Sequence, residues 1–437
     1  MAGQAAAYDG LRARRCLWPP LRLTRVCREH ESVFVASPAT SQSWLNEREG
    51  RSRMRFIGID VHRDFCEVCV LDRVSGEEQR RRLATRPAEL EAFADELNQD
   101  DVIALETSSP ATAVARLLEP YAGRVLVIDP RRLVRAGARA KTDRLDARTL
   151  ARLLAAGVLT EIWTPDEQTR ALRRLVSRRA AVVRARTRLK NEVHAVLART
   201  LCPRPPVSDA FGKAGRRWLA TLELPEEEQL TVRGCLRQID ALEADVAELE
   251  VALAKRLGGS RELRRLLSVP GVNLVVAATF LAYVGDIRRF PSPKHLVGYL
   301  GLDPRVSQSG NTAARGGRIS KQGAAEVRHV LSEAAWRGAR VPGPLRGFYE
   351  RIRARRGAQI AITATARKLA VLFWHLLTRE QDYAYAMPSQ VQRKRRALEL
   401  LAGAPPHHGR AGADGPCRPA ASLREREREI AVAAERA

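Results

Sequence analysis

Runs of hydrophobic residues from position 54 onward predict an ordered series of strands and helices. Three strand-like runs come first, a helix follows, and strand and helix then alternate. The expected elements are strands at Arg55–Val61, Phe65–Leu71 and Glu78–Ala84, a helix at Pro87–Leu97, a strand at Val102–Glu106, a helix at Ala111–Leu118 and a strand at Arg124–Ile128. This order is typical of a ribonuclease-H-like (RuvC-like) α/β domain, whose late parallel strands need helices as crossovers.

The middle of the chain predicts two long helices. The first spans Gln168–Leu201, and a Pro-rich break at Cys202–Val207 separates it from the second, at Pro225–Leu257. Apolar residues of the second helix recur at alternating spacings of three and four, which is typical of a coiled-coil seam. They are Val232, Cys235, Ile239, Leu242, Val246, Leu249 and Leu253. The seam fits packing on the first helix within one chain, or pairing across a dimer.

The last third of the chain predicts a mainly α-helical domain. Leu267–Gly271 (LSVPG), followed by an apolar helix at Val272–Val284, resembles a helix-hairpin-helix, whose Pro-Gly turn presents backbone N–H groups to a phosphate. A Pro-Gly between two helices is also an ordinary turn. Near the end of the chain, Leu423–Ile430 alternates in charge and predicts a short solvated helix.

These patterns divide the chain into five segments. Residues 1–53 lack sustained periodicity and precede the first strand, so they are a disordered extension or follow from a mis-assigned start codon, and we expect them to be dispensable. The expected divisions are 1–53, the catalytic α/β domain at 54–160, a basic helical, coiled-coil segment at 161–260, the C-terminal domain at 261–380 and a largely disordered tail at 381–437.

Charge favours a polyanionic partner. The 437 residues carry a formal net charge of +25, with a pI near 10.8, and most of the excess is arginine, which binds phosphate through two N–H groups. The first long helix concentrates basic residues where acids are nearly absent, which favours a nucleic-acid surface over a solvated face. The candidate contacts are Arg178, Arg179, Arg184, Arg188 and Lys190, with Lys321 farther along the chain.

Cysteines and apolar runs favour a cytoplasmic protein. Cys66 and Cys69 form a CxxC within a predicted strand, where residues three apart face opposite ways and share no metal ion. Seven cysteines without a framework are typical of a reducing compartment. The sequence shows no uninterrupted apolar run long enough to span a membrane, so we expect no membrane partner.

Four carboxylates provide the candidate chemistry. Asp60 and Glu106 end predicted strands, while Asp143 and Asp146 lie three apart at an expected helix start. Each alone fits a turn, a cap or a helix N-terminus. Four acids that converge repel one another unless cations neutralise them, so the set predicts a Mg²⁺ site, with Mn²⁺ as an alternative.

Three motifs resemble the N-terminal domain of DEDD-type transposases of the insertion-sequence one-ten family. They are FIGIDVH (56–62), ALETSS (104–109) and KTDRLDARTLARLL (141–154). The resemblance covers about residues 54–377 and implies that Asp60, Glu106, Asp143 and Asp146 are the metal-binding tetrad, in a fold similar to Holliday-junction resolvases. This chain has Ser108-Ser109 where family members commonly have a glycine.

The C-terminal motifs resemble the second domain of the same family. Gly285–Phe290, Leu300–Pro304, Arg318–Gly323 and Arg328–Leu331 follow one another in the family's order. The resemblance implies that Ser309 is a recombination nucleophile, with Ser307 as its rival by position. It also implies double-stranded DNA as the partner, with donor ends and a target, together with a structured guide RNA encoded by the element.

The function predicted from the sequence is therefore a transposase or site-specific recombinase of an insertion sequence. We expect a homo-oligomer, a dimer or a tetramer, because recombination needs more than one active site. The protein would be cytoplasmic and would lie on the nucleoid when bound to DNA. The alternatives are a Holliday-junction-resolvase-like endonuclease, an inactive transposase-derived DNA-binding protein, and a nucleic-acid scaffold with an incidental acid cluster.

Overall fold

The computed structural model describes residues 54–108, 110–129, 143–307, 315–405 and 421–436 of the protein. The expectations for residues 1–53 lie outside this range. Within it, the predicted strands and helices of the first domain are all present. One helix is shorter than expected, because turns that follow Ala94 replace its last three residues.

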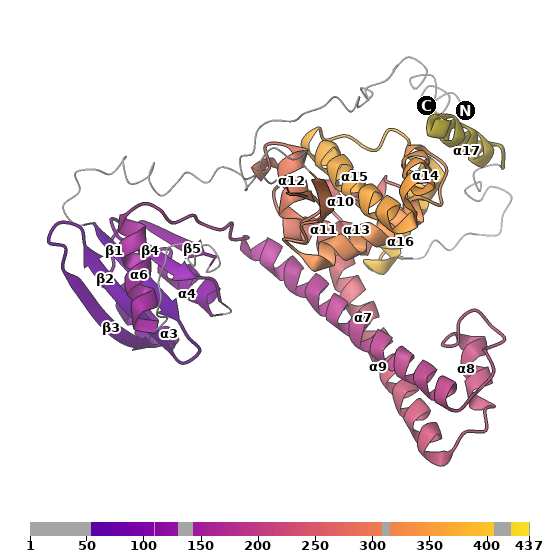
Figure 1. Ribbon diagram of the computed structural model, residues 1–437, viewed down its shortest axis with the longest axis horizontal. Helices are drawn as coiled ribbons and strands as arrows, with labels where there is room; N and C mark the ends of the chain where they lie inside the picture. The colour runs from indigo at the N-terminus through magenta and orange to yellow at the C-terminus, as the bar shows by residue number, and fades with distance from the viewer. Residues whose placement is uncertain (1–53, 109, 130–142, 308–314, 406–420, 437) are drawn as a thin grey trace. The chain divides into compact units, whose positions relative to one another are not determined.

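A five-stranded sheet is the centre of the first domain (Figure 1). Its strand order is β3-β2-β1-β4-β5, with β1 antiparallel to β2, β2 antiparallel to β3, and β1, β4 and β5 parallel. The strands are β1 (Arg55–Val61), β2 (Phe65–Asp72), β3 (Glu78–Ala84), β4 (Val102–Glu106) and β5 (Arg124–Ile128). This mixed sheet is the ribonuclease-H-like arrangement that the sequence predicted.

Successive side chains along each strand point to opposite faces of the sheet, and both faces are apolar. One face packs on α3 (Pro87–Ala94) and α4 (Ala111–Leu118), and the other is covered by α6 (Asp143–Ala155), as Figure 1 shows. Cys66 belongs to the first face and Cys69 to the second, which confirms that this pair of thiols cannot share a metal ion. Burial raises the pKa of both thiols, so both favour the protonated form.

The middle of the chain is an antiparallel pair of long helices. The start of α7 (Glu167–Arg199) shares a core with the end of α9 (Glu226–Leu257), and the end of α7 packs on the start of α9. The short helix α8 (Lys213–Ala220) lies between them in the chain. Most of the predicted seam residues of α9 are buried, including Ile239 and Leu253. The seam therefore packs on α7 within one chain, one of the two alternatives left open by the sequence.

The C-terminal part is mainly helical and carries one small hairpin. Its elements are α10 (Arg261–Leu267), α11 (Leu274–Val284), the 3₁₀ helix η2 (Ile287–Arg289), α12 (Pro293–Tyr299), the strands β6 (Pro304–Ser307) and β7 (Arg315–Ile319), α13 (Ala325–Gly338), α14 (Pro344–Arg356), α15 (Ala358–Thr378), α16 (Pro388–Leu401) and α17 (Ala421–Arg436). Helix α15 has the length and apolar composition of a membrane-crossing helix. Its Leu369 and Phe373 are fully buried in the protein core, so we interpret it as a core helix.

The Pro-Gly turn of the expected helix-hairpin-helix packs on one side against α13. Gly271 has φ +83°, and a Cβ there would lie 2.3 Å from the carbonyl oxygen of Ala334 in α13. Ser268 and Val269, which precede the turn, are buried, whereas Gly271 and residues 273–275 are half-exposed. The turn thus lets α11 approach α13 closely, and phosphate contact by its backbone N–H groups stays a prediction.

Candidate active site

Two of the four candidate carboxylates lie side by side at the ends of parallel strands. The β1–β4 register pairs Ile59 with Leu105, so Asp60 and Glu106 come one residue later on neighbouring strands. Ile59 and Leu105 face α3 and α4, and strand alternation therefore turns both acids to the face that α6 covers. The Asp60 side chain is only 14% exposed. Strand register thus brings together two acids that are far apart in the chain.

Gly58 fixes how closely α6 approaches these acids. A Cβ at Gly58 would lie 2.0 Å from the carbonyl oxygen of Ala147 and 2.6 Å from the backbone nitrogen of Ala151. No side chain fits such a gap, so the backbones of β1 and α6 touch only because residue 58 is glycine. The glycine of the FIGID motif therefore determines where the helix begins relative to the strand.

The direction of α6 brings its first turn toward Asp60. Ala147 touches Gly58, whereas the later residues Leu150 and Leu154 belong to the cluster of Met54 and Phe56, at the start of β1. The helix therefore runs antiparallel to β1, and its N-terminus extends toward the Asp60 end of the strand. Asp143 and Asp146 lie in this first turn by their backbone positions. Their side chains lie outside the described structure.

Polar neighbours lie close to Asp60 and Glu106 in the chain. The Oδ2 atom of Asp60 lies 3.2 Å from the Nε2 atom of His62, which extends into the hairpin turn after β1. At the start of α4, the backbone N–H of Ala111 donates to the Oγ atom of Ser108 at 3.2 Å. The Ser108 hydroxyl thus accepts from the first residue of α4, whose N-cap residue is Pro110.

Glu67 is a fifth carboxylate that the sequence reasoning missed. It lies directly opposite Asp60 in the β1–β2 register and is 6% exposed. The Nε atom of Arg82 in β3 donates to it at 2.7 Å, so this acid already has a cation partner. Pairing the strands across the tight His62–Phe65 turn would have placed Glu67 beside Asp60 from sequence alone.

The base of the β6–β7 hairpin is held by backbone contacts. A Cβ at Gly301 would lie 2.1 Å from the carbonyl oxygen of Gln322, and one at Gly323 would lie 2.2 Å from that of Tyr299. The Ser320 backbone N–H also donates to the carbonyl oxygen of Asp303 at 2.8 Å. These contacts fix the start of β6 at Pro304 and the end of β7 at Ile319, which are not the strand ends that border residues 308–314. Ser309, the candidate nucleophile, lies outside the described residues.

Comparison with known sequences identifies the family. A profile described as "Transposase IS116/IS110/IS902 family" matches residues 263–350, and the IS110-type DEDD transposase profile matches residues 57–202. The chain belongs to the IS110 family of DEDD transposases. The four candidate acids fall within the second range, and Ser309 falls within the first.

Curated relatives agree with this assignment. The chain is similar to "Putative transposase y4qE" of Sinorhizobium fredii, with 36% identity over 51% of this chain and 54% of the relative. It is also similar to "Probable family 20 transposase" of Pseudomonas aeruginosa, with 27% identity over 75% of this chain and 98% of the relative. "Transposase for insertion sequence element IS1111A" of Coxiella burnetii shares 25% identity over 84% of this chain and 98% of the relative. The match thus spans about half the length of the first relative and nearly all of the others.

Basic residues on α7 of this transposase divide into paired and exposed groups. Arg179 donates to Glu250 of α9 at 2.6 Å, Arg178 lies 3.7 Å from Asp245, and Lys190 lies 3.7 Å from Glu243. The acids that α7 lacks are therefore supplied by α9, which the one-dimensional pattern could not show. Arg184 and Arg188 are exposed, and within the described residues neither has a carboxylate within 4.0 Å.

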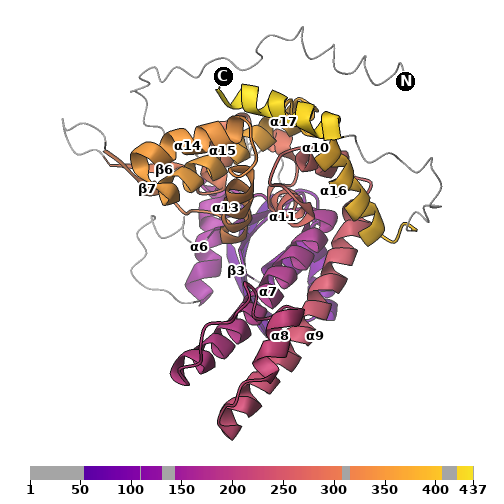
Figure 2. The ribbon, with the colours of Figure 1, turned by 90° about the vertical axis from the view of Figure 1, so that its right-hand side faces the viewer.

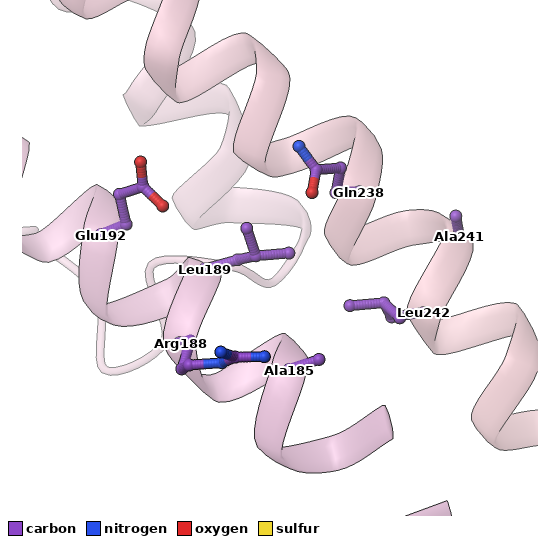
Figure 3. Close-up of a pocket in the computed structure, with 7 residues that line it drawn as sticks. All are labelled: Ala185, Arg188, Leu189, Glu192, Gln238, Ala241 and Leu242. Atoms are coloured by element: carbon purple, nitrogen blue, oxygen red, sulfur yellow. The ribbon is translucent and has the colours of Figure 1, made fainter. Parts of the chain in front are cut away.

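Arg188 borders a shallow pocket between the two long helices of the transposase. Figure 3 shows Arg188, Leu189 and Glu192 on α7, opposite Gln238 and Leu242 on α9. Of the six candidate nucleic-acid contacts, Arg184 and Arg188 are the two arginines that are exposed and have no carboxylate of the described residues within 4.0 Å. Lys321 is exposed as well, and it adopts φ +56° in the loop that fixes the hairpin base.

The donor set suits a hard divalent cation. DEDD transposase domains of this kind generally use divalent metal ions, and carboxylate oxygens are the ligands that such ions prefer. Asp60 and Glu106 place two carboxylates on adjacent strands. Among the described residues, no group of three or more His, Cys, Asp and Glu side chains is close enough to hold a metal ion. Asp143 and Asp146 would complete the set from α6.

Proposed function

We propose that the transposase binds Mg²⁺, or Mn²⁺ in its place, through Asp60, Glu106, Asp143 and Asp146, and uses this centre to cleave and rejoin DNA. The observation that supports the proposal most is the glycine contact between β1 and α6. It leads the first turn of α6 toward the end of the strand that carries Asp60. This first turn is the part of α6 that carries Asp143 and Asp146.

The four acids would hold the cation and orient the scissile phosphate. A bound divalent ion would neutralise the carboxylates and stabilise the charge that develops on the phosphate. Asp60 and Glu106 are fixed by the sheet, whereas Asp143 and Asp146 belong to a helix end. Asp60 is largely shielded from water, which strengthens its interaction with a cation.

Ser309 would attack the DNA phosphate in this proposal. Its Oγ atom forms a bond to phosphorus, the bond from phosphorus to one strand's oxygen breaks, and that strand leaves with a free hydroxyl. The serine proton passes by way of a carboxylate of the centre to the oxygen of the leaving strand. A hydroxyl of a second DNA strand then displaces the serine, so the phosphodiester energy is kept and no ATP is needed. The hairpin base fixed by Gly301 and Gly323 would limit the positions open to Ser309.

The partners follow from the same proposal. Double-stranded DNA supplies donor ends and target, and a structured RNA encoded by the element would select them by base pairing. Strand exchange between two DNA molecules requires at least two active sites, so we propose a dimer or a tetramer acting in the cytoplasm, on the nucleoid when bound to DNA. The seam of α9 is used within one chain, so another surface would join the subunits.

Substitution of single acids tests the metal centre. Asp60→Asn, Glu106→Gln, Asp143→Asn and Asp146→Asn should each abolish strand cleavage and weaken Mn²⁺ binding measured by calorimetry. DNA binding should persist or tighten, because repulsion between acid and phosphate falls. Asp64→Asn is the matched control, since Asp64 is exposed in the hairpin turn after β1. Normal cleavage by Asp60→Asn would show that the assignment is wrong.

The product distinguishes the alternatives. A transposase yields joined strand-transfer products, whereas a Holliday-junction-resolvase-like endonuclease yields nicks that stay open. A chain that binds DNA yet cleaves none of its element's ends in Mg²⁺ or Mn²⁺ would be a transposase-derived DNA-binding protein. Sequencing the DNA that flanks the gene, and the RNA that purifies with the protein, would supply the substrates for this assay.

A further inference from the structure

The C-terminal helix α17 docks on its neighbours through two glutamates. Glu427 is 5% exposed, and both the backbone N–H and the hydroxyl of Ser389 donate to it at the start of α16. At the start of α14, the backbone N–H of Gly343 donates to Glu435 at 3.3 Å. Helix N-termini carry partial positive charge, so each glutamate stabilises a helix end as it attaches α17. Figure 2 shows α17 beside the helical C-terminal part.

The docked helix completes a pocket that is rich in arginine. An open pocket of about 780 Å³ lies between α16, α17 and the connection from α13 to α14. Six arginines line it: Arg340, Arg346, Arg393, Arg396, Arg424 and Arg428. The one acid that lines it is Glu427, which already accepts both hydrogen bonds of Ser389. The pocket therefore has a strong positive excess.

Four of these guanidinium groups are open to a ligand. Arg346 pairs with Glu435, and Arg396 pairs with Glu399. The other four, Arg340, Arg393, Arg424 and Arg428, are exposed, and no carboxylate of the described residues lies within 4.0 Å of any of them. Like charges held together repel one another, and an anion that enters between them relieves this repulsion.

We propose that this arginine pocket binds the phosphate backbone of duplex DNA. Guanidinium groups match phosphate oxygens with paired N–H donors, and Gln390 and Gln392 add neutral donors at the same surface. The pocket lining contains no aromatic side chain, so it offers no platform for stacking unpaired bases. Its chemistry therefore suits a continuous duplex backbone, and it would read no sequence.

The pocket would add a DNA-binding surface that lies only partly within the matched family regions: Arg340 and Arg346 fall inside residues 263–350, and the other four arginines fall beyond them. The profile matches end at residue 350, whereas α16 and α17 follow later in the chain. This surface is independent of the proposed acid centre, since none of its residues belongs to the tetrad or the β6–β7 hairpin. Failure of one proposal therefore leaves the other standing.

Salt-dependent binding tests the pocket. The full-length triple variant Arg393→Gln, Arg424→Gln and Arg428→Gln should bind a labelled duplex of about 30 base pairs at least tenfold more weakly. Its log–log salt slope should fall by about 0.9 for each phosphate that the variant no longer neutralises. The matched control is Arg426→Gln, which removes an exposed arginine of α17 that does not line the pocket. That control should keep the wild-type slope.

A second variant separates loss of charge from loss of fold. The corresponding triple Arg→Lys variant keeps the charge and should recover most of the affinity if phosphate binding matters. Unfolding temperatures should match among the variants, because the docking glutamates stay intact. The proposal is overturned if the triple Gln variant and the Arg426→Gln control give equal slopes. It is overturned as well if the weakened binding appears with a structured RNA and not with duplex DNA.

Discussion

Gly58 is the residue on which the geometry of the candidate active site depends most. It lies within a strand, where glycine usually weakens the structure because it packs no side chain. Here the missing side chain is what allows contact, since the backbone of α6 occupies the space of a Cβ. Two residues later, Asp60 faces the same helix.

Gly58→Ala should therefore destabilise the protein and impair cleavage. The new methyl group meets backbone atoms that cannot rotate away, so β1 and α6 must separate, at a cost of about 1–3 kcal/mol. Urea unfolding should show this destabilisation, and cleavage should fall further than DNA binding. Gly234→Ala is the control, because a Cβ at that position of α9 meets nothing within 4 Å. That change should stabilise by about 0.5–1 kcal/mol.

Ser309→Ala tests the candidate nucleophile without disturbing the fold. The change removes one hydroxyl group and adds no atom. Folding and DNA binding should be unchanged, while recombination and any covalent protein–DNA adduct should disappear. Peptide mapping of the adduct formed by the unaltered protein should identify Ser309. An adduct on Ser307, which ends β6, would assign the role to that residue instead.

Among the secondary-structure elements, α7 shows how a partner helix changes the meaning of a basic stripe. The sequence of α7 has few acids, but its arginines face acids of α9 across the helix pair. The exposed fraction separates the two roles: Arg178 keeps 64% of its side chain exposed, and Arg179 only 20%. Arg179 thus helps to hold the helices together, while other arginines stay open to phosphate.

Two sets of α7 variants should behave differently. Arg184→Gln with Arg188→Gln should weaken nucleic-acid binding and lower the salt slope by roughly 0.7–0.9 per phosphate no longer neutralised, with little change in stability. Arg179→Gln should instead lower the free energy of unfolding, by about 1–3 kcal/mol, because Glu250 loses its partner in a partly buried pair. Salt titrations and urea unfolding measure the two effects. An unchanged slope in the first variant would show that these arginines form only a solvated face.

At the scale of the whole molecule, Lys394 connects the end of the chain to the core of the C-terminal part. Its Nζ atom donates to the carbonyl oxygens of Leu267 and Val269 at 2.8 Å each, at the turn after α10. Burial, with a smaller contribution from Arg393, lowers the pKa of Lys394 to about 8. The pKa of a lysine in the unfolded chain is about 10.4.

Stability should therefore rise with pH over a defined window. Between about pH 8 and about pH 10.4 the unfolded chain binds the Lys394 proton and the folded chain releases it, so rising pH favours the folded state. The gain reaches about 3 kcal/mol at the upper limit, and below about pH 8 the burial cost is present in full. Lys394→Met should lack this part of the pH dependence. Urea unfolding of both proteins at several pH values measures the difference, and equal slopes would refute the shift.

Local patterns predicted the elements of the first domain and the long helix pair well, because each depends on neighbouring residues. The prediction of a largely disordered tail at 381–437 was wrong, since α16 and α17 lie there and pack on the C-terminal part. Hydrophobic runs predicted the strands, and apolar residues spaced three and four apart predicted the long helices. The alternating charges at Leu423–Ile430 fall within α17. That last prediction was incomplete, since Glu427 is buried against the start of α16. The sequence of a charged repeat does not show which of its glutamates caps another helix.

The sequence by itself determined the succession of strands and helices in the first domain, the two strand-end acids and the family. The spacing of the motifs and the periodicity of apolar side chains along the chain carry that information. Only the tertiary structure decided that Arg82 of β3 pairs with Glu67, that α9 neutralises part of α7, and that the Pro270-Gly271 turn packs on α13. The tertiary structure also brings together the six arginines of the pocket, which are spread over residues 340–428. Such contacts join distant segments through packing and register, which no local pattern specifies.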